Sequence, residues 1–237
     1  VVLDELIWGF GAENGTPDDV WKSKDGVNWE LVAATVPWQE RGNQLVTVFD
    51  GSIWVMGGQT GDDAQTSFVA DLKAGKPFTP TPSPLRDVWR TNDGLSWERV
   101  TDDAPWAPRG MITGANGGVS VFDDRMWILG GGYVGAGGTT LSSLRYDVER
   151  QPRLKARQYY NDVWSSANGR EWICHLTQGE APWPARSYHD TAVFDGKLWV
   201  LGGHRGVADR VAEVATDGNR NAAVSYTHLR AHETEAD

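Results

Sequence analysis

The sequence is poor in cysteine, in clustered histidine and in long apolar runs. Its 237 residues include one cysteine, Cys174, which excludes an internal disulfide and a zinc site built from several cysteines. The histidines share no local spacing except His228 and His232, near the C-terminus, so we expect no metal and no cofactor. No apolar run reaches the roughly 18 residues that a membrane span needs, and no leader-like segment opens the chain. We therefore expect no membrane insertion.

Positive charge is also scarce. The chain has 22 Lys and Arg against 32 Asp and Glu, a formal net charge of -10. A general nucleic-acid binder needs a basic face, so we expect no nucleic-acid partner. No phosphate-binding or dinucleotide-binding glycine motif occurs between a strand and a helix.

Tryptophan is abundant, and all 13 tryptophans fall into four repeating positions. A tryptophan at the first position follows an apolar residue and stands three residues before a glycine, as in Trp-Val-Met-Gly. A tryptophan at the second position ends the tripeptide Asp-Val-Trp, and one at the third position follows 8 residues later. A tryptophan at the fourth position follows a proline. In that order the positions hold Trp8, Trp54, Trp127 and Trp199; Trp21, Trp89 and Trp164; Trp29, Trp97 and Trp172; and Trp38, Trp106 and Trp183. Self-similarity on this scale indicates a repeat array with one continuous core.

One repeat unit reads as four short strands. Residues 45–49 are β-branched and aromatic, and Asp50-Gly51 is a two-residue turn signal. Residues 53–56 form a continuous apolar run, which is typical of a strand buried on both faces. Residues 87–91 and 97–100 complete the unit on either side of Asn92-Asp93-Gly94. Four antiparallel strands of this length predict one blade of a β-propeller.

The other units predict the same blade. Residues 119–122 with 126–129, and residues 191–194 with 198–201, match the first two strands. We therefore predict an all-β chain of about three to four four-stranded antiparallel blades. The expected boundaries are a partial blade at 1–38, blades at 39–106 and 107–183, a partial blade at 184–221, and a non-repeat tail at 222–237.

The best unit carries a more specific pattern. Pro184-Ala185-Arg186-Ser187-Tyr188-His189 precedes its first strand, and Gly202-Gly203 follows its second. This resembles kelch repeats, which also build the central domain of galactose oxidase, and the resemblance covers roughly residues 5 to 205. It implies a kelch-type propeller fold. The chain departs from the pattern where Gln44 and Ile112 stand in place of His189, and where Gly11-Ala12 replaces the glycine pair.

Most of the repeated residues are expected to be structural. Buried tryptophans supply large apolar areas, and the paired glycines permit positive φ or a close backbone approach. Arg41, Arg109 and Arg186 recur after the Pro-Trp segment, and we expect them to donate hydrogen bonds from blade to blade. The expected structural set is Trp54, Gly57, Gly58, Trp89, Trp97, Trp127, Gly130, Gly131, Trp164, Trp172, Arg186, His189, Trp199, Gly202 and Gly203.

Sequence variation is concentrated on one face. Loops between strands 2 and 3 share a face of the propeller with those between strands 4 and 1. The length of the loop between strands 2 and 3 follows from the distance between the first and the second tryptophan position, which is 13 residues in the first unit, 35 in the second and 37 in the third. Rigid scaffolds commonly carry function on such loops. The second long loop, residues 133–160, is basic and aromatic on an acidic chain. The candidate ligand-binding residues are Asp62, Asp63, Tyr133, Arg145, Tyr146, Arg153, Arg157, Tyr159, His204 and Arg205.

Recognition of a protein or a glycan through this face is the function we predict, in preference to catalysis. A first alternative is an enzyme on a kelch scaffold, such as a sialic-acid or other sugar mutarotase, or a glycan-acting hydrolase or lyase. A sialidase would need an arginine cluster and a tyrosine. The residues that could supply them stand at framework positions of the repeat, which are Arg41, Arg109, Arg186 and Tyr188. A copper radical oxidase would need a tyrosine–cysteine cross-link and histidine ligands. We do not expect this chemistry, because Cys174 lies within a predicted strand and no histidine pair flanks a plausible site. The second alternative is a structural module of a larger secreted protein.

The ends of the chain do not match a finished propeller. Leu6-Ile7-Trp8 already matches a second strand, and residues 225–233 read as helix or coil and resemble translated adapter sequence. We therefore expect a fragment whose remaining blades belong to a longer protein, with an extracytoplasmic location favoured. Exposed blade faces would make this chain oligomeric or poorly soluble on its own.

Overall fold

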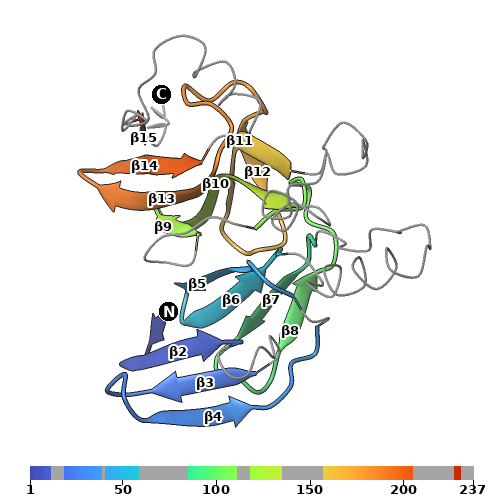
Figure 1. Ribbon diagram of the computed structural model, residues 1–237, viewed down its shortest axis with the longest axis vertical. Coiled ribbons are helices and arrows are strands. Elements are labelled where there is room, and N and C mark those ends of the chain that lie inside the picture. Colours follow the sequence, from blue (N-terminus) through green and yellow to red (C-terminus); the bar gives the residue numbers. More distant parts are fainter. Residues whose placement is uncertain are drawn as a thin grey trace, which may run out of the picture.

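The computed structural model describes residues 1–11, 19–38, 41–58, 85–110, 118–134, 157–204 and 227–230. Within these residues the fold is all-β, without a helix, and its strands form four antiparallel sheets. Strand order within each sheet follows the sequence, and the sheets succeed one another from the blue strands to the orange strands in Figure 1. The prediction of an all-β propeller arc of antiparallel blades is confirmed.

The strands are short, as the turn spacing predicts. The first sheet holds β1 (Val2–Leu3), β2 (Leu6–Phe10), β3 (Val20–Ser23) and β4 (Trp29–Ala33), and the second holds β5 (Leu45–Phe49), β6 (Ser52–Met56), β7 (Val88–Thr91) and β8 (Glu98–Thr101). The third holds β9 (Ser120–Phe122), β10 (Arg125–Val134), β11 (Arg157–Ser166) and β12 (Ile173–Leu176), and the fourth holds β13 (Ser187–Phe194), β14 (Lys197–His204) and β15 (Thr227–Arg230).

Apolar side chains fill the spaces between successive sheets. Every residue of β6 is buried, because Ile53 joins a cluster with the first sheet while Trp54 and Met56 join one with the third. The next interface combines residues of β10 and β14, including Leu129 and Val200. A strand buried on both faces was expected for residues 53–56, and the burial pattern confirms it.

Two kinds of turn fix the hairpins. The first and second strands are joined by two residues with positive φ, such as Asp50 and Gly51, in the conformation that the right-handed strand twist favours. The third and fourth strands are joined by a turn in which one side chain bonds two backbone N–H groups. In the second sheet, Asp93 Oδ1 accepts from the N–H groups of Leu95 and Ser96, at 2.8 and 2.7 Å. Asp25 and Asn168 hold the same bonds in the first and third sheets.

Indole N–H groups are bonded at three of the four tryptophan positions. The first position donates to a carbonyl five residues earlier, the second to an aspartate two residues earlier, and the third to the turn glycine three residues earlier. The distances in the second sheet are 2.9 Å from Trp54 to Phe49, 2.7 Å from Trp89 to Asp87 and 3.1 Å from Trp97 to Gly94. At the fourth position, Trp106 and Trp183 bury Nε1 without a hydrogen-bond partner.

Two expectations about the ends of the chain are wrong, namely that the first blade is partial and that the stretch around residues 225–233 is helix or coil. Residues 2–3 form a short first strand paired with β2, so the first sheet has four strands. The turn Asp4–Glu5 takes positive φ at both residues, the conformation of Asp50–Gly51. Residues 227–230 are not helix or coil, because they pair antiparallel with β14 as a third strand.

Candidate functional site

The candidate site lies on the face from which the long loops leave, here called the loop face. It is marked by the glycine pairs that follow the second strands, Gly57–Gly58, Gly130–Gly131 and Gly202–Gly203. At Gly58, φ is +86° and a Cβ would lie 2.9 Å from the carbonyl oxygen of Gly42. Glycine is needed there because the backbone conformation and the neighbouring chain both exclude a side chain.

Backbone hydrogen bonds join neighbouring sheets across this face. Gly58 N–H donates to the carbonyl of Arg109 at 2.8 Å, and Gly131 N–H donates to the carbonyl of Arg186 at 3.2 Å. Within the third blade, Gly110 and Gly132 exchange two further bonds, at 2.8 and 3.1 Å. The loop face therefore rests on a bonded frame that runs from the second sheet to the fourth.

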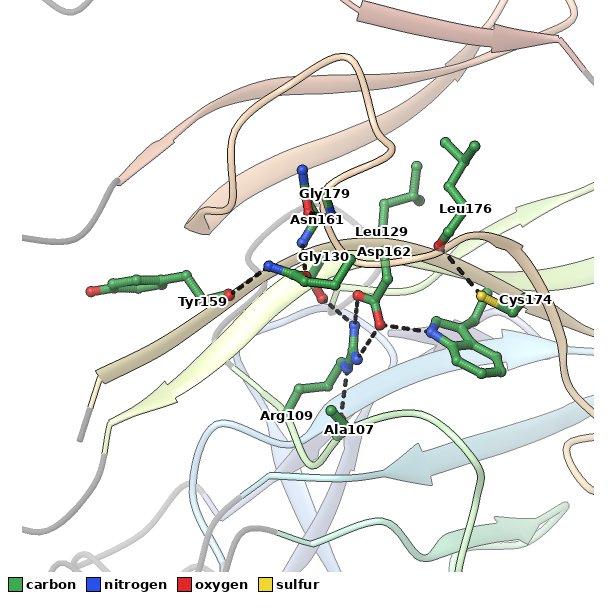
Figure 2. Close-up of polar contacts among 12 residues, drawn as sticks. Ala107, Arg109, Leu129, Gly130, Tyr159, Asn161, Asp162, Cys174, Leu176 and Gly179 are labelled. Carbon is green, nitrogen blue, oxygen red and sulfur yellow. Dashed lines mark hydrogen bonds and ion pairs between the residues drawn. The ribbon is translucent and has the colours of Figure 1, made fainter. Parts of the chain in front are cut away.

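Arg109 sits beneath this frame and is fully buried. Its Nη1 and Nη2 donate to the two carboxylate oxygens of Asp162 at 2.6 and 2.8 Å, and its Nη1 also donates to the Gly130 carbonyl at 3.0 Å (Figure 2). Its Nε donates to the Ala107 carbonyl at 2.8 Å. The guanidinium carbon lies 4.5 Å from the ring centroid of Tyr160. Bidentate pairing and ring contact use the planar guanidinium in ways that lysine could not.

Arg41 repeats this arrangement in the second sheet. It pairs with both oxygens of Asp87, at 2.6 and 2.7 Å, and donates to the Gly57 carbonyl at 3.0 Å. Arg186 donates to the Gly202 carbonyl in the fourth sheet. The expectation of blade-to-blade donors is therefore wrong for the side chains, which tie strands of their own sheet. The contact between sheets is made instead by the arginine backbone carbonyl.

This geometry limits what the arginines can do chemically. Arg41 and Arg109 are 1% and 0% exposed, and each is already bound to a carboxylate of its own sheet. A substrate carboxylate would have to displace that partner in a buried site. The sialidase-like reading of these two arginines is thus not supported, and their role is to hold the loop face in place.

The third sheet carries a longer hairpin than the second. β10 and β11 have 10 residues each, whereas β6 has 5 and β7 has 4. A bulge between Leu129 and Gly131 precedes four further residue pairs, from Gly131–Tyr160 to Val134–Arg157. We call these residues, 131–134 and 157–160, the stalk. The second long insertion is therefore mounted on a paired two-stranded base.

The stalk brings some of the predicted ligand-binding residues together. Tyr133, Arg157 and Tyr159 all belong to it, and the Tyr159 carbonyl accepts a bond from Gln178 at 3.4 Å. His204 lies elsewhere, at the end of β14, where its backbone pairs with Ser187. The candidates Asp62, Asp63, Arg145, Tyr146, Arg153 and Arg205 lie outside the described residues.

Two further residues on this face do not belong to the predicted ligand-binding set. Asn43 and Tyr188 each stand two positions after the repeated arginine, and both adopt left-handed backbone, with φ of 56° and 53°. Tyr188 is 46% exposed. Left-handed conformation at residues other than glycine is uncommon and concentrates at functional sites. The signal was present in the sequence, because Asn43, Met111 and Tyr188 differ in chemistry at one position of an otherwise regular unit.

Two other polar groups are unsuited to catalysis. Burial lowers the pKa of His189 to about 4, and its Nε2 lies 2.7 Å from the Leu129 carbonyl in the interface between the third and fourth sheets. Cys174 lies on β12 and is exposed as a residue. Partial loss of water around its thiol is the largest of the causes that raise its pKa. A thiol with a raised pKa is a weak nucleophile at neutral pH. Within the described residues, no group of three His, Cys, Asp or Glu side chains could hold a metal ion.

Comparisons with known proteins support the fold. No protein-family model and no curated protein sequence matches this chain. Among solved structures, that of YjhT is similar with a TM-score of 0.55 and 16% sequence identity, over 86% of this chain. The chain spans 57% of the length of that structure. At this identity the likeness supports a kelch-like propeller fold. No helix in the described part of the chain is long and apolar enough to cross a membrane.

Proposed function

We propose that this chain is a recognition module that binds an acidic ligand through its loop face. The observation that carries the proposal is the stalk, which extends one hairpin beyond the glycine pair and holds a basic insertion on a paired base. The paired base fixes where the two ends of the insertion lie, and fixed ends reduce the conformational entropy lost on binding. On the opposite face, the described turns between third and fourth strands are short and closed by their own hydrogen bonds.

The composition of the stalk and its insertion indicates the ligand class. Residues 133–160 contain five basic residues, Arg145, Arg150, Arg153, Lys155 and Arg157, against two acidic residues, Asp147 and Glu149. Tyrosines stand at both ends of the segment. Arginine recognises carboxylate groups, and tyrosine offers a flat apolar surface with a polar tip. A carboxylate-bearing glycan fits both, and an acidic segment of a protein is the other partner with this chemistry.

A glycan-binding screen with the purified chain tests this proposal. We expect retention of acidic glycans over their neutral counterparts, weakened by salt because the contacts are electrostatic. Arg153→Gln and Arg157→Gln should reduce that retention. Arg170→Gln is the matched control, since Arg170 is an exposed arginine in the β11–β12 turn on the opposite face. Equal loss with all three variants, or no preference for acidic glycans or acidic peptides, would contradict the proposal.

A second candidate function is a sugar mutarotase on the same scaffold. The observation that favours it is Tyr188, an exposed phenol held in left-handed backbone at the start of β13. Ring opening of a sugar needs only proton transfer, which a positioned phenol can assist. Anomer exchange of an acidic sugar, followed by NMR, should then be accelerated by the chain and slowed by Tyr188→Phe. Exchange at the rate of buffer alone would exclude this candidate for the chain as it stands.

A further inference from the structure

The turn between third and fourth strands differs in one residue among the first three sheets. Asp25 and Asp93 stand before the turn glycine in the first and second sheets, and Asn168 stands there in the third. In all three turns, the Oδ1 atom of this residue accepts hydrogen bonds from the backbone N–H groups two and three positions later. The third turn therefore holds a neutral amide at a place that fits a carboxylate equally well.

Asparagine followed by glycine is open to an intramolecular reaction. The backbone nitrogen of glycine attacks the side-chain carbonyl carbon of asparagine and closes a five-membered imide ring, while the amide leaves as ammonia with the proton of that nitrogen. Water then opens the ring and gives aspartate or, after attack at the main-chain carbonyl, isoaspartate. Glycine favours ring closure because it has no side chain to restrict its backbone. Of the three Asn-Gly pairs in the sequence, Asn168–Gly169 lies within the described residues.

The third turn supplies groups that assist each part of this reaction. The backbone N–H groups of Arg170 and Glu171 donate to Asn168 Oδ1 at 3.0 and 2.9 Å, so they would stabilise the negative charge that develops on this oxygen when the nitrogen adds. The attacking N–H of Gly169 donates to Ser166 Oγ at 2.8 Å, and this hydroxyl can receive its proton. Asn168 is exposed, which leaves a path for ammonia to depart and for water to enter.

The packing of the turn favours one of the two products. Aspartate keeps the length of the main chain, and Asp93 shows that a carboxylate accepts the same two N–H groups, at 2.8 and 2.7 Å. Isoaspartate adds one carbon to the main chain and would displace Gly169. That glycine is buried, and its Cα lies so close to the ring of Trp54 that an added Cβ would clash. Displacement would therefore disturb the contact between the second and third sheets.

We propose that Asn168 is a modification site, at which the folded chain converts its own asparagine into aspartate. Water is the co-reactant and ammonia is the leaving group. The conversion makes the third turn chemically equivalent to the turns of the first two sheets. It also places a negative charge beside Arg170, on the face opposite the loop face. This inference does not depend on the proposed ligand.

Peptide mapping by mass spectrometry, on the folded full chain held at neutral pH over a time series, tests the proposal. The peptide that carries Asn168 should gain the mass difference between an amide and an acid, and should elute with the same peptide of the Asn168→Asp variant. Asn28 is the matched control, because it is exposed in the corresponding turn of the first sheet but precedes Trp29. We expect conversion at Asn168 to be at least about tenfold faster than at Asn28, since the reacting groups are held together in one turn.

A second series in guanidinium chloride separates reaction of the folded turn from reaction of the unfolded chain. Circular dichroism shows that the native sample stays folded throughout. Conversion should be at least as fast in the native chain as in the unfolded chain, and aspartate should form a larger share of the native product. Conversion that follows only unfolding would overturn the proposal, as would isoaspartate as the main native product, or equal conversion at Asn28.

Discussion

The contact between the second and third sheets differs in polarity from that between the third and fourth. The first is built mainly from apolar side chains, with Trp106 and Trp172 packed edge to face at 5.9 Å, and it holds one buried hydroxyl, Thr47, which donates to the Val119 carbonyl at 3.4 Å. The second also has an apolar layer, but it buries the imidazole of His189 and a bonded hydroxyl pair, Ser120 with Thr191 at 2.9 Å. The same repeat frame thus accepts a largely apolar contact and a more polar one, here called the apolar and the polar contact, and of these two only the polar one buries a histidine, the residue whose unperturbed pKa lies near neutral pH.

The largest effect is expected from crowding the apolar contact. Gly169→Ala would place a Cβ against the Trp54 ring and would force alanine into φ of +72°. Overpacking costs about 1–3 kcal/mol and left-handed backbone about 1–2 kcal/mol, so we expect a loss of roughly 3–4 kcal/mol in the free energy of unfolding. Gly196→Ala is the control, because its φ is +63° but nothing lies within 4 Å. Denaturant titration should show a loss of only about 1 kcal/mol there, and equal losses would contradict the packing argument.

The polar contact should weaken in acid. Because burial lowers the folded-state pKa of His189 to about 4, the unfolded chain, with a histidine pKa of about 6.5, takes up the proton first. Stability from this group is present above about pH 6.5 and is lost as pH falls towards 4, by about 3 kcal/mol. His189→Gln places there the residue that Gln44 supplies in the second sheet. The variant should lack this part of the pH dependence in urea titrations at each pH, and an unchanged profile would assign it to other groups.

A smaller difference is expected between two buried tryptophans of the apolar contact. Trp54 donates from Nε1 to the Phe49 carbonyl, whereas the Nε1 of Trp106 has no partner. Phenylalanine removes the N–H group in both cases, but only at position 54 does it remove a hydrogen bond. Trp54→Phe should therefore be about 1 kcal/mol more destabilising than Trp106→Phe in chemical denaturation. The reverse order would show that lost packing volume outweighs the bond.

The smallest effect is expected at the turns. Backbone N–H groups of Ser96 and Leu95 bond the carboxylate of Asp93 and hold its pKa below the usual value, partly against desolvation. Its contribution is present above the unfolded-state pKa of about 3.9 and is lost as pH falls through the lower folded value. Asn168 makes the same bonds without a charge. Asp93→Asn should flatten the loss of stability between about pH 5 and pH 3, and Asn168→Asp should steepen it.

Local features of the fold were predictable from the sequence because their causes are local. The Asp-Gly turns and the apolar run at 53–56 determine their own hairpin and burial through residues only a few positions apart. β1 was missed because its two residues are too few to show an alternating pattern. β15 was missed because its pairing with β14 comes from a distant part of the chain rather than from its own sequence.

The site was less predictable, because its geometry depends on distant pairs. The partner of Arg41 is Asp87, which lies 46 residues further along, so the direction of its hydrogen bonds could not be read from the repeat. The stalk had no strand signal, since its first strand begins with glycines and its second with Arg157-Gln158. Tyr188 was assigned to the framework because its neighbours Arg186 and His189 are framework residues. Its exposure follows from the left-handed turn of the backbone, which the residue type alone does not reveal.

The bond from each second glycine to the next arginine carbonyl has a consequence for how the chain unfolds. Gly58 bonds the segment that leads into the third sheet, and Gly131 bonds the segment that leads into the fourth, so within the described residues these bonds couple each sheet to its immediate neighbour. Such a chain behaves as a one-dimensional lattice, in which free energy is a sum of unit terms and nearest-neighbour terms. Partly unfolded forms should then be contiguous blocks that shrink from the ends. Among the four described sheets, protection of amide hydrogens from exchange should accordingly be high in the second and third sheets, which pack against a described sheet on both sides.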